Sequence, residues 1–228
     1  TKYPLVDKRL RPDLAILDSD FLKELPPGLI ADTGFDVLTH AVEGFTAAKA
    51  GAFTDLFAQE AFRIAYGSLP ASFAGRQEVR LKLHMASCMA GVAFSQAGLG
   101  LCHAMAHSLG GRFHVPHGRL NAILLPAVIE NNTSGCGKKY AQLARAAGMG
   151  GSADTVALRN LKNGLIRLRR ELGLPQSLTQ AGVAPGKIWG AMGEIVESVL
   201  ADPCCKTNPI PVEDFQIRRI LEEVTGHL

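Results

Sequence analysis

The stretch GLGLCHAMAHSLGGRFHVPHG, residues 98–118, contains four of the seven histidines in the chain. His103, His107, His114 and His117 fall within fifteen residues, in a segment interrupted by glycines. Burying polar rings without partners costs about 1–3 kcal/mol each, so the cluster favours a shared role for these side chains. On a helix, His103 and His107 share one face, and the glycine-containing bend after them could bring His117 back toward His103.

A second constellation lies in GFDVLTHAVE, residues 34–43, where Asp36 and His40 are spaced to lie one helical turn apart. Three imidazoles and one carboxylate suit a divalent transition metal such as Fe, Zn, Co or Ni, and leave room for a substrate oxygen. Each histidine alone would also fit a hydrogen-bonded core or surface position, and Thr33 with Asp36 could form a capping box. Their joint occurrence is what predicts a metal site.

The composition fits one globular body, which we expect to be a single helical domain over residues 1–228. Hydrophobic residues make up 47% of the chain, and the net charge of +3 comes from 24 basic and 21 acidic residues. No clustered Lys/Arg stripe is present, so we expect no nucleic-acid partner. The densest basic segment, RLRR at 167–170, is predicted to be a solvated helix face.

The five cysteines form no C-x-x-C pair, which argues against a disulfide framework and favours a reducing cytoplasm. The adjacent Cys204 and Cys205 are interpreted as small buried or loop residues. No leader opens the sequence, and its longest apolar run, residues 120–129, is about half of a bilayer span, so no membrane association is expected. Because the chain begins at Thr1, it reads as a fragment of a longer polypeptide.

The pattern predicts an all-α fold, an irregular bundle of about nine helices with one short N-terminal strand. That strand is predicted at 13–18, followed by a helix start capped by Asp18 or Ser19. Residues 77–98, rich in Ala, Gly, Ser and Met, are expected to form a helix buried on most sides. Pro126 is expected to kink or break its helix, and residues 135–139 and 148–155 to form turns. Helical periodicity extends over 28–47, 53–73, 77–98, 119–132, 139–148, 152–172, 184–200 and 212–228.

Three segments, GFDVLTHAVEGF, GLGLCHAMAHSLGGRFHVPHG and NAILLP, closely resemble the signatures of the iron-containing (group III) alcohol dehydrogenases. Residues 86–107 look most like the enzymes of ethanolamine and propanediol utilisation. The resemblance implies the C-terminal half of the fold that this family shares with dehydroquinate synthase. It also implies that Asp36, His40, His103 and His117 bind the metal, and it favours Fe(II) over Zn.

The same resemblance implies an oxidoreductase that interconverts a short-chain aldehyde and its primary alcohol by hydride transfer with NAD(H) or NADP(H). It places His107 as the proton relay and Lys2 as a residue that reaches the cofactor. Arg119, where relatives carry an aliphatic residue, is expected to face solvent rather than a cofactor phosphate. His114 is expected at the surface or behind the ligands, and His84 and His227 in structural or exposed positions.

The Gly-Gly-Gly-Ser-x-x-Asp loop that cradles the pyrophosphate in family members does not occur in this sequence. We therefore expect the N-terminal dinucleotide-binding domain to be absent from this chain, and the isolated chain to bind metal with little or no turnover. The resemblance further implies a homodimer, in the cytoplasm or inside a bacterial microcompartment. The alternatives are a non-catalytic helical metal-binding or assembly module, and a polyol dehydrogenase or dehydroquinate synthase-like relative.

Overall fold

The computed structural model describes residues 7–10 and 12–226. Within these ranges the chain forms nine α-helices and four short 3-10 helices, so the predicted all-helical bundle is confirmed. The α-helices are α1 (Pro27–Thr46), α2 (Ala52–Phe73), α3 (Arg80–Ala97), α4 (Leu101–Phe113), α5 (His117–Ala146), α6 (Asp154–Glu171), α7 (Pro185–Gly190), α8 (Met192–Ala201) and α9 (Asp214–Thr225). The 3-10 helices are η1 (Lys8–Leu10), η2 (Ser19–Leu22), η3 (Gln77–Val79) and η4 (Pro203–Thr207).

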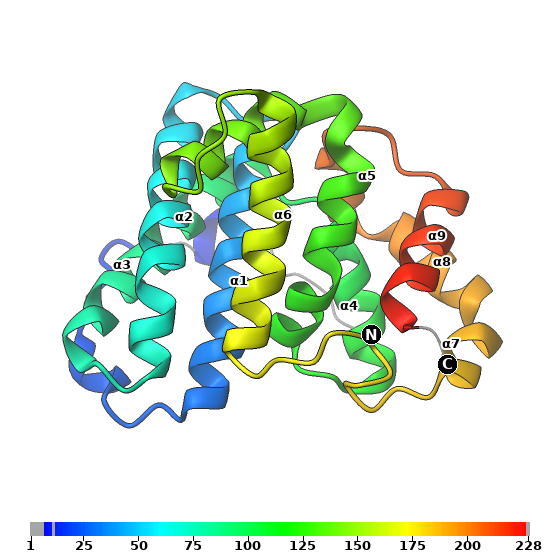
Figure 1. The fold of residues 1–228 in the computed structure, drawn as a ribbon, viewed down its shortest axis with the longest axis horizontal. Helices are drawn as coiled ribbons and strands as arrows, with labels where there is room; N and C mark the ends of the chain where they lie inside the picture. Colours follow the sequence, from blue (N-terminus) through cyan, green and yellow to red (C-terminus); the bar gives the residue numbers. More distant parts are fainter. Residues whose placement is uncertain (1–6, 11, 227–228) are drawn as a thin grey trace.

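Helix α1 lies at the centre of the bundle and is covered by α2, α3 and α5 (Figure 1). Fourteen of its 20 residues are buried, which follows from an apolar pattern that continues around most of the helix. Helices α2 and α3 form one side of the molecule, and α7, α8 and α9 form the other (Figure 1). Helix α4 packs against α5, α8 and η4, so the histidine segment lies between the central and C-terminal helices.

The short strand predicted at 13–18 is wrong, because the described residues include no strand. A strand needs a neighbouring strand to satisfy its backbone groups, and the described part of the chain provides none. Two apolar side chains of this segment are solvent-exposed, Leu14 at 76% and Ile16 at 80%, and Leu17 is only partly buried. The predicted cap is confirmed at Asp18, whose Oδ1 accepts the N–H of Asp20, but it begins only the short helix η2.

Helix α3 does not lie buried on most sides as its composition suggested. Only five of its 18 residues are buried, and four of them are the alanines Ala86, Ala90, Ala93 and Ala97. These small residues recur at helical spacing and let one face of α3 pack closely against α1 and α2. The larger side chains of Met85 and Val92 stay nearly half exposed on the other face.

Helix α5 continues through Pro126 and bends instead at Cys136, whose φ of −143° and ψ of 23° are not helical. Proline has no N–H to donate, so the Ala122 carbonyl one turn earlier loses its helical partner. Arg169 of α6 supplies the donor: its guanidinium bonds to the carbonyls of Ala122 at 3.0 Å and Ile123 at 3.2 Å. The RLRR segment is therefore not simply a solvated face, because Arg169 is buried and burial lowers its pKa to about 10.

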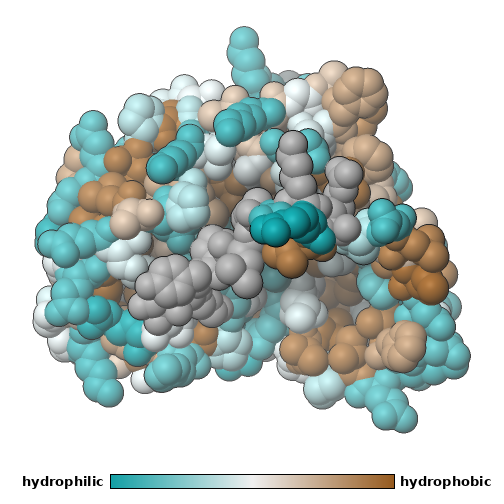
Figure 2. All heavy atoms as spheres, turned by 180° about the vertical axis from the view of Figure 1, so that it is seen from behind, coloured by the Kyte–Doolittle hydropathy of each residue, from teal (hydrophilic) through white to brown (hydrophobic). Residues whose placement is uncertain are grey.

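The rear face of the molecule shows hydrophobic patches interspersed with hydrophilic side chains (Figure 2). Among the described residues, no helix taken singly has the length and apolarity needed to cross a membrane. The segments Gln77–Ala97 and Leu101–Phe113, which meet at a 104° bend, reach that threshold only as a pair and only by length and composition.

Candidate metal centre

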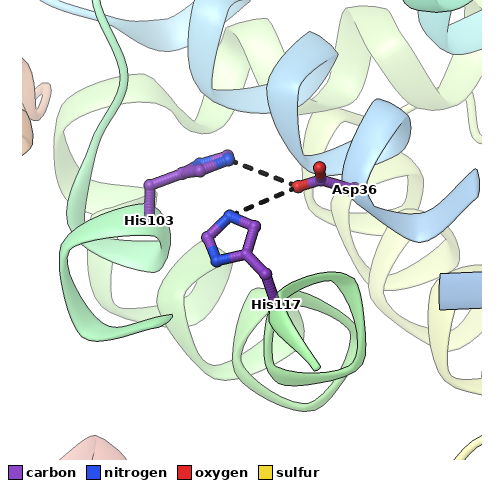
Figure 3. Close-up of side chains that lie close together, drawn as sticks. All are labelled: Asp36, His103 and His117. Atoms are coloured by element: carbon purple, nitrogen blue, oxygen red, sulfur yellow. Dashed lines mark ion pairs between the residues drawn. The ribbon is translucent and has the colours of Figure 1, made fainter. Parts of the chain in front are cut away.

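Three of the four predicted metal ligands converge on one point. Asp36 comes from α1, His103 from the first turn of α4, and His117 begins α5 (Figure 3). Asp36 Oδ1 lies 3.5 Å from Nε2 of His103 and 3.5 Å from Nε2 of His117. All three ligand atoms lie within 4.8 Å of one another, so one cation could contact them together.

His40, the fourth predicted ligand, lies beside this group without joining it. Its Nδ1 is 3.9 Å from Asp36 Oδ2. Its ring stacks on His103 and on Phe94, with both pairs of ring centroids 4.5 Å apart. The helical spacing therefore places His40 next to the site, but its ring lies parallel to that of His103 instead of turning toward the same point.

The start of α5 holds His117 close to α1. A Cβ on Gly118 would lie 1.8 Å from the Asp32 carbonyl oxygen, so only glycine permits this approach of the two backbones. Arg119 fixes the same contact with two hydrogen bonds to the Asp32 carboxylate, at 3.0 and 3.1 Å. The expectation that Arg119 faces solvent is thus corrected, since its side chain is two-thirds buried in an ion pair.

Glu43 is a site residue that the sequence interpretation missed. Its buried carboxylate accepts the N–H groups of Gly100 at 3.0 Å and Cys102 at 2.7 Å, which stabilises the beginning of α4. Its Oε2 also lies 2.6 Å from Nδ1 of His103, which orients Nε2 of that ring toward Asp36. Glu43 could have been found, because it continues the Asp36 and His40 face of α1 by one more turn.

Asn121 is the second missed residue, one helical turn after His117. Its Nδ2 donates to Asp36 Oδ1 at 2.7 Å and lies 3.3 Å from His117 Nε2 and 3.5 Å from His103 Nε2. The partly positive amide group therefore faces all three candidate ligands. A cation would be a stronger partner for the same atoms.

The electrostatics of the site favour positive charge. Burial raises the pKa of Asp36, but the hydrogen bond with His103 and the neighbouring imidazoles outweigh it and hold this pKa well below its ordinary value. Burial alone would lower the pKa of His103, yet its hydrogen bonds with Asp36 and Glu43 raise it to about 9. Burial and the nearby His103 lower the pKa of His40 to about 3. Without metal, the imidazole of His103 therefore carries its extra proton between the carboxylates of Asp36 and Glu43.

The predicted proton relay, His107, lies one turn beyond His103 and stacks on His117 with ring centroids 5.2 Å apart. Its Nδ1 is 2.9 Å from Oδ2 of Asp202, at the end of α8. The ligand atoms of His107, Asp202 and Cys204 also lie within 4.8 Å of one another. Oδ2 of Asp202 is engaged with His107 and Oδ1 with the Cys204 N–H, so the carboxylate is held by hydrogen bonds within the chain. Burial and the charge of Asp202 raise the pKa of the Cys204 thiol.

The other histidines and Lys2 are residues for which the sequence predicted no role as metal ligands. His114 ends α4 in the left-handed conformation, with φ of 58°, and is exposed, which confirms a surface position. His84 is partly buried on α3 and is not one of the three converging ligands, although it lines the same pocket as Asp36 and His40. Lys2, the predicted cofactor contact, and His227 lie outside the described residues.

The donor set fits a transition metal. A tetrahedral ion with bonds of about 2.1 Å to nitrogen separates its ligand atoms by about 3.4 Å. The separation of 3.5 Å from Asp36 Oδ1 to each ring nitrogen matches that geometry. Nitrogen donors with a single carboxylate suit Fe or Zn better than Mg or Ca, which require more oxygen.

Residues 30–225 match the family described as "Fe-containing alcohol dehydrogenase family, C-terminal". The chain is 37% identical to the NADPH-dependent butanol dehydrogenase of Clostridium saccharobutylicum, over 97% of this chain and 57% of that protein. It is 41% identical to the 1-propanol dehydrogenase PduQ of Salmonella typhimurium, over 98% of this chain and 62% of that protein. The chain thus spans little more than half the length of these relatives.

The fold is also similar to a solved structure, the iron-containing alcohol dehydrogenase from Thermococcus thioreducens. The two superpose with a TM-score of 0.89 and 33% sequence identity, over 97% of this chain and 57% of that one. The family resemblance drawn from the sequence motifs is therefore confirmed.

Proposed function

Because this chain belongs to the iron-containing alcohol dehydrogenase family, we propose that it is the metal-binding half of an NAD(P)-linked oxidoreductase. The reaction is the interconversion of a short-chain aldehyde and its primary alcohol. The observation that carries the proposal is the convergence of Asp36, His103 and His117 within the residues that match the family. The butanol and 1-propanol dehydrogenases among the relatives support a short unbranched substrate.

We assign the metal to Asp36, His40, His103 and His117, with Fe(II) as the resident ion and Zn as the alternative. His40 joins the other three by turning its ring out of the stack with His103. When bound, the ion supplies Lewis acidity toward the substrate oxygen while hydride moves between the substrate carbon and the nicotinamide.

The chain's own residues prepare that site. Glu43 fixes the ring of His103 and the first turn of α4, so that Nε2 needs little reorganisation to bind. Asn121 keeps Asp36 and the two ring nitrogens together before the metal arrives. His107, one turn along α4, moves the hydroxyl proton between the substrate and solvent.

The nicotinamide cofactor belongs, in this proposal, to a dinucleotide-binding domain that precedes residues 1–228 in a longer polypeptide. The Clostridium relative is an NADPH-dependent butanol dehydrogenase, and for this chain we propose NAD(H) or NADP(H) as the cofactor. Contact between Lys2 and the cofactor stays a prediction. So do the kinship of the fold with dehydroquinate synthase, homodimer formation, and action in the cytoplasm or a bacterial microcompartment.

Elemental analysis of purified variants tests the proposal. The unsubstituted chain, His103→Ala, His107→Ala and His114→Asn are each loaded anaerobically with Fe(II), or with Zn(II), and desalted. We expect His103→Ala to lose the metal, because it removes a ligand from the centre. His107→Ala and the control His114→Asn should retain it, since neither side chain belongs to the ligand set.

The proposed role of His107 in the reaction is tested in a polypeptide that joins this chain to a dinucleotide-binding domain. There, His107→Ala should slow aldehyde reduction by about 10²- to 10⁴-fold while the metal content stays unchanged. Equal metal content in His103→Ala and the unsubstituted chain would refute the ligand assignment. Unchanged turnover in His107→Ala would refute the relay.

A further inference from the structure

We propose that Asp202 is a positioning residue that fixes which nitrogen of His107 carries the proton. This inference rests on the proposed function, in which His107 moves the substrate proton. The carboxylate holds the proton on Nδ1 and leaves Nε2 as the nitrogen that accepts a proton in the site. Asp202 acts through His107 and has no contact with substrate in this account.

The first support is the geometry of the pair. Asp202 Oδ2 lies 2.9 Å from His107 Nδ1, at hydrogen-bond distance, although the two residues are 95 positions apart. An ionised carboxylate is only an acceptor, so the ring must donate from Nδ1. The Asp202 side chain is 9% exposed, and water competes little for this contact.

The second support is the way Asp202 itself is held. It caps η4, and its Oδ1 accepts the N–H of Cys204 at 2.8 Å. The turn of η4 is in turn fixed to the segment before α4, because the Thr207 hydroxyl donates to the Leu99 carbonyl at 2.6 Å. One oxygen of the carboxylate is therefore committed to the backbone, and the other is directed to His107.

The third support is the parallel with Glu43. His103 and His107 lie on successive turns of α4. Each has a carboxylate from a remote segment at its Nδ1, Glu43 for His103 and Asp202 for His107. In both rings the carboxylate engages Nδ1 and leaves Nε2 free of it, and in His103 that Nε2 faces Asp36. Removing a carboxylate that fixes the ring of a metal-bound histidine typically lowers metal affinity or activity by 10- to 100-fold. We infer the same orienting effect on the proton-moving histidine.

The matched substitution is Asp202→Asn. Asparagine caps a helix as well as aspartate does, so the Cys204 N–H keeps its acceptor. The amide has only one oxygen, however, and its NH₂ group then faces Nδ1 of His107. An N–H donor there favours the opposite tautomer, with the proton on Nε2.

The direct test is ¹⁵N NMR of the histidine rings in the 228-residue chain, metal-free and again with Zn(II) added. The His107 signals are assigned by their loss in His107→Gln. We expect a protonated Nδ1 and an unprotonated Nε2 in the unsubstituted chain and in the control Cys204→Ser, which retains the carboxylate. In Asp202→Asn the two signals should exchange or mix. Identical ring signals in Asp202→Asn and the unsubstituted chain would overturn the proposal.

The kinetic test uses the polypeptide that also carries a dinucleotide-binding domain. Asp202→Asn should lower kcat by about 10- to 100-fold with little change in KM for the aldehyde and full metal content. An unchanged kcat would overturn the role in the reaction. Loss of metal from every variant and from the unsubstituted chain would instead contradict the proposed function, while the NMR result would still decide the tautomer.

Discussion

Oε2 of Glu43 lies 2.6 Å from Nδ1 of His103, and the same carboxylate accepts the backbone N–H groups that begin α4. One buried side chain of the central helix thus sets both the start of the histidine helix and the orientation of a candidate ligand. The metal centre and the core of the bundle are built from the same contacts.

Glu43→Gln should weaken both the stability of the fold and the binding of metal. The amide has one acceptor oxygen in place of two, so at least one buried N–H loses its partner. We expect the free energy of unfolding to fall by about 1.5–3 kcal/mol and zinc affinity to fall by about 10- to 100-fold. Urea unfolding and competition with a chelating dye measure the two effects. The control Glu60→Gln, in an exposed pair with Arg63, should change stability by less than about 1 kcal/mol. Unchanged zinc affinity in Glu43→Gln would contradict the orienting role.

Arg169→Met should destabilise α5. Methionine retains a long apolar stem but supplies no donor to the Ala122 carbonyl, which Pro126 leaves without a helical partner, or to the Ile123 carbonyl. We expect a loss of about 2–4 kcal/mol in chemical unfolding. The exposed neighbour provides the comparison, because Arg170→Met should stay within about 0.5 kcal/mol. Equal effects of the two substitutions would show that Arg169 does not satisfy those carbonyls.

Gly118→Ala should separate α5 from α1. The added Cβ meets the Asp32 carbonyl oxygen, a backbone atom that cannot rotate away. We expect at least about 1–3 kcal/mol of destabilisation and weaker metal binding, because His117 is the adjacent residue. Gly28→Ala, with nothing within 4 Å of the new Cβ, should be neutral or slightly stabilising. A Gly118→Ala chain with full stability and metal affinity would argue against this close approach.

Metal removal should lower the thermal stability of the chain. Zinc at about one hundred times its dissociation constant stabilises the folded state by about 2.7 kcal/mol, which corresponds to about 5–10 °C in Tm for a domain of this size. Differential scanning calorimetry with zinc and with a chelator measures the shift. His103→Ala should show no such difference. Equal Tm values for the unsubstituted chain under both conditions would exclude a tight site.

Much of the bundle could be predicted from periodicity, because helices such as α1 and α9 carry their apolar pattern locally. Features that depend on remote neighbours could not. Arg169 is buried because Pro126, on another helix, leaves the Ala122 carbonyl without a helical partner, and the guanidinium bonds to that carbonyl and to the carbonyl of Ile123. The segment 13–18 has a strand-like pattern, yet strand formation requires a partner that the described chain does not contain.

The same distinction applies to the site. Asp36, His40, His103 and His117 were predicted because helical spacing and family motifs mark them, and three of them, Asp36, His103 and His117, lie together in the structure. Asp202 contacts His107 across 95 positions, and no local pattern connects the two. Glu43 and Asn121 stand at helical spacing from predicted ligands, so extending each face by one turn would have found them.

The most direct test is anomalous X-ray diffraction from crystals of the iron-loaded chain, measured on both sides of the iron absorption edge. We predict one iron peak within bonding distance, about 2.0–2.2 Å, of Asp36, His40, His103 and His117, with His40 turned toward the ion. An iron peak elsewhere, or no peak among these four side chains in loaded crystals, would contradict the account.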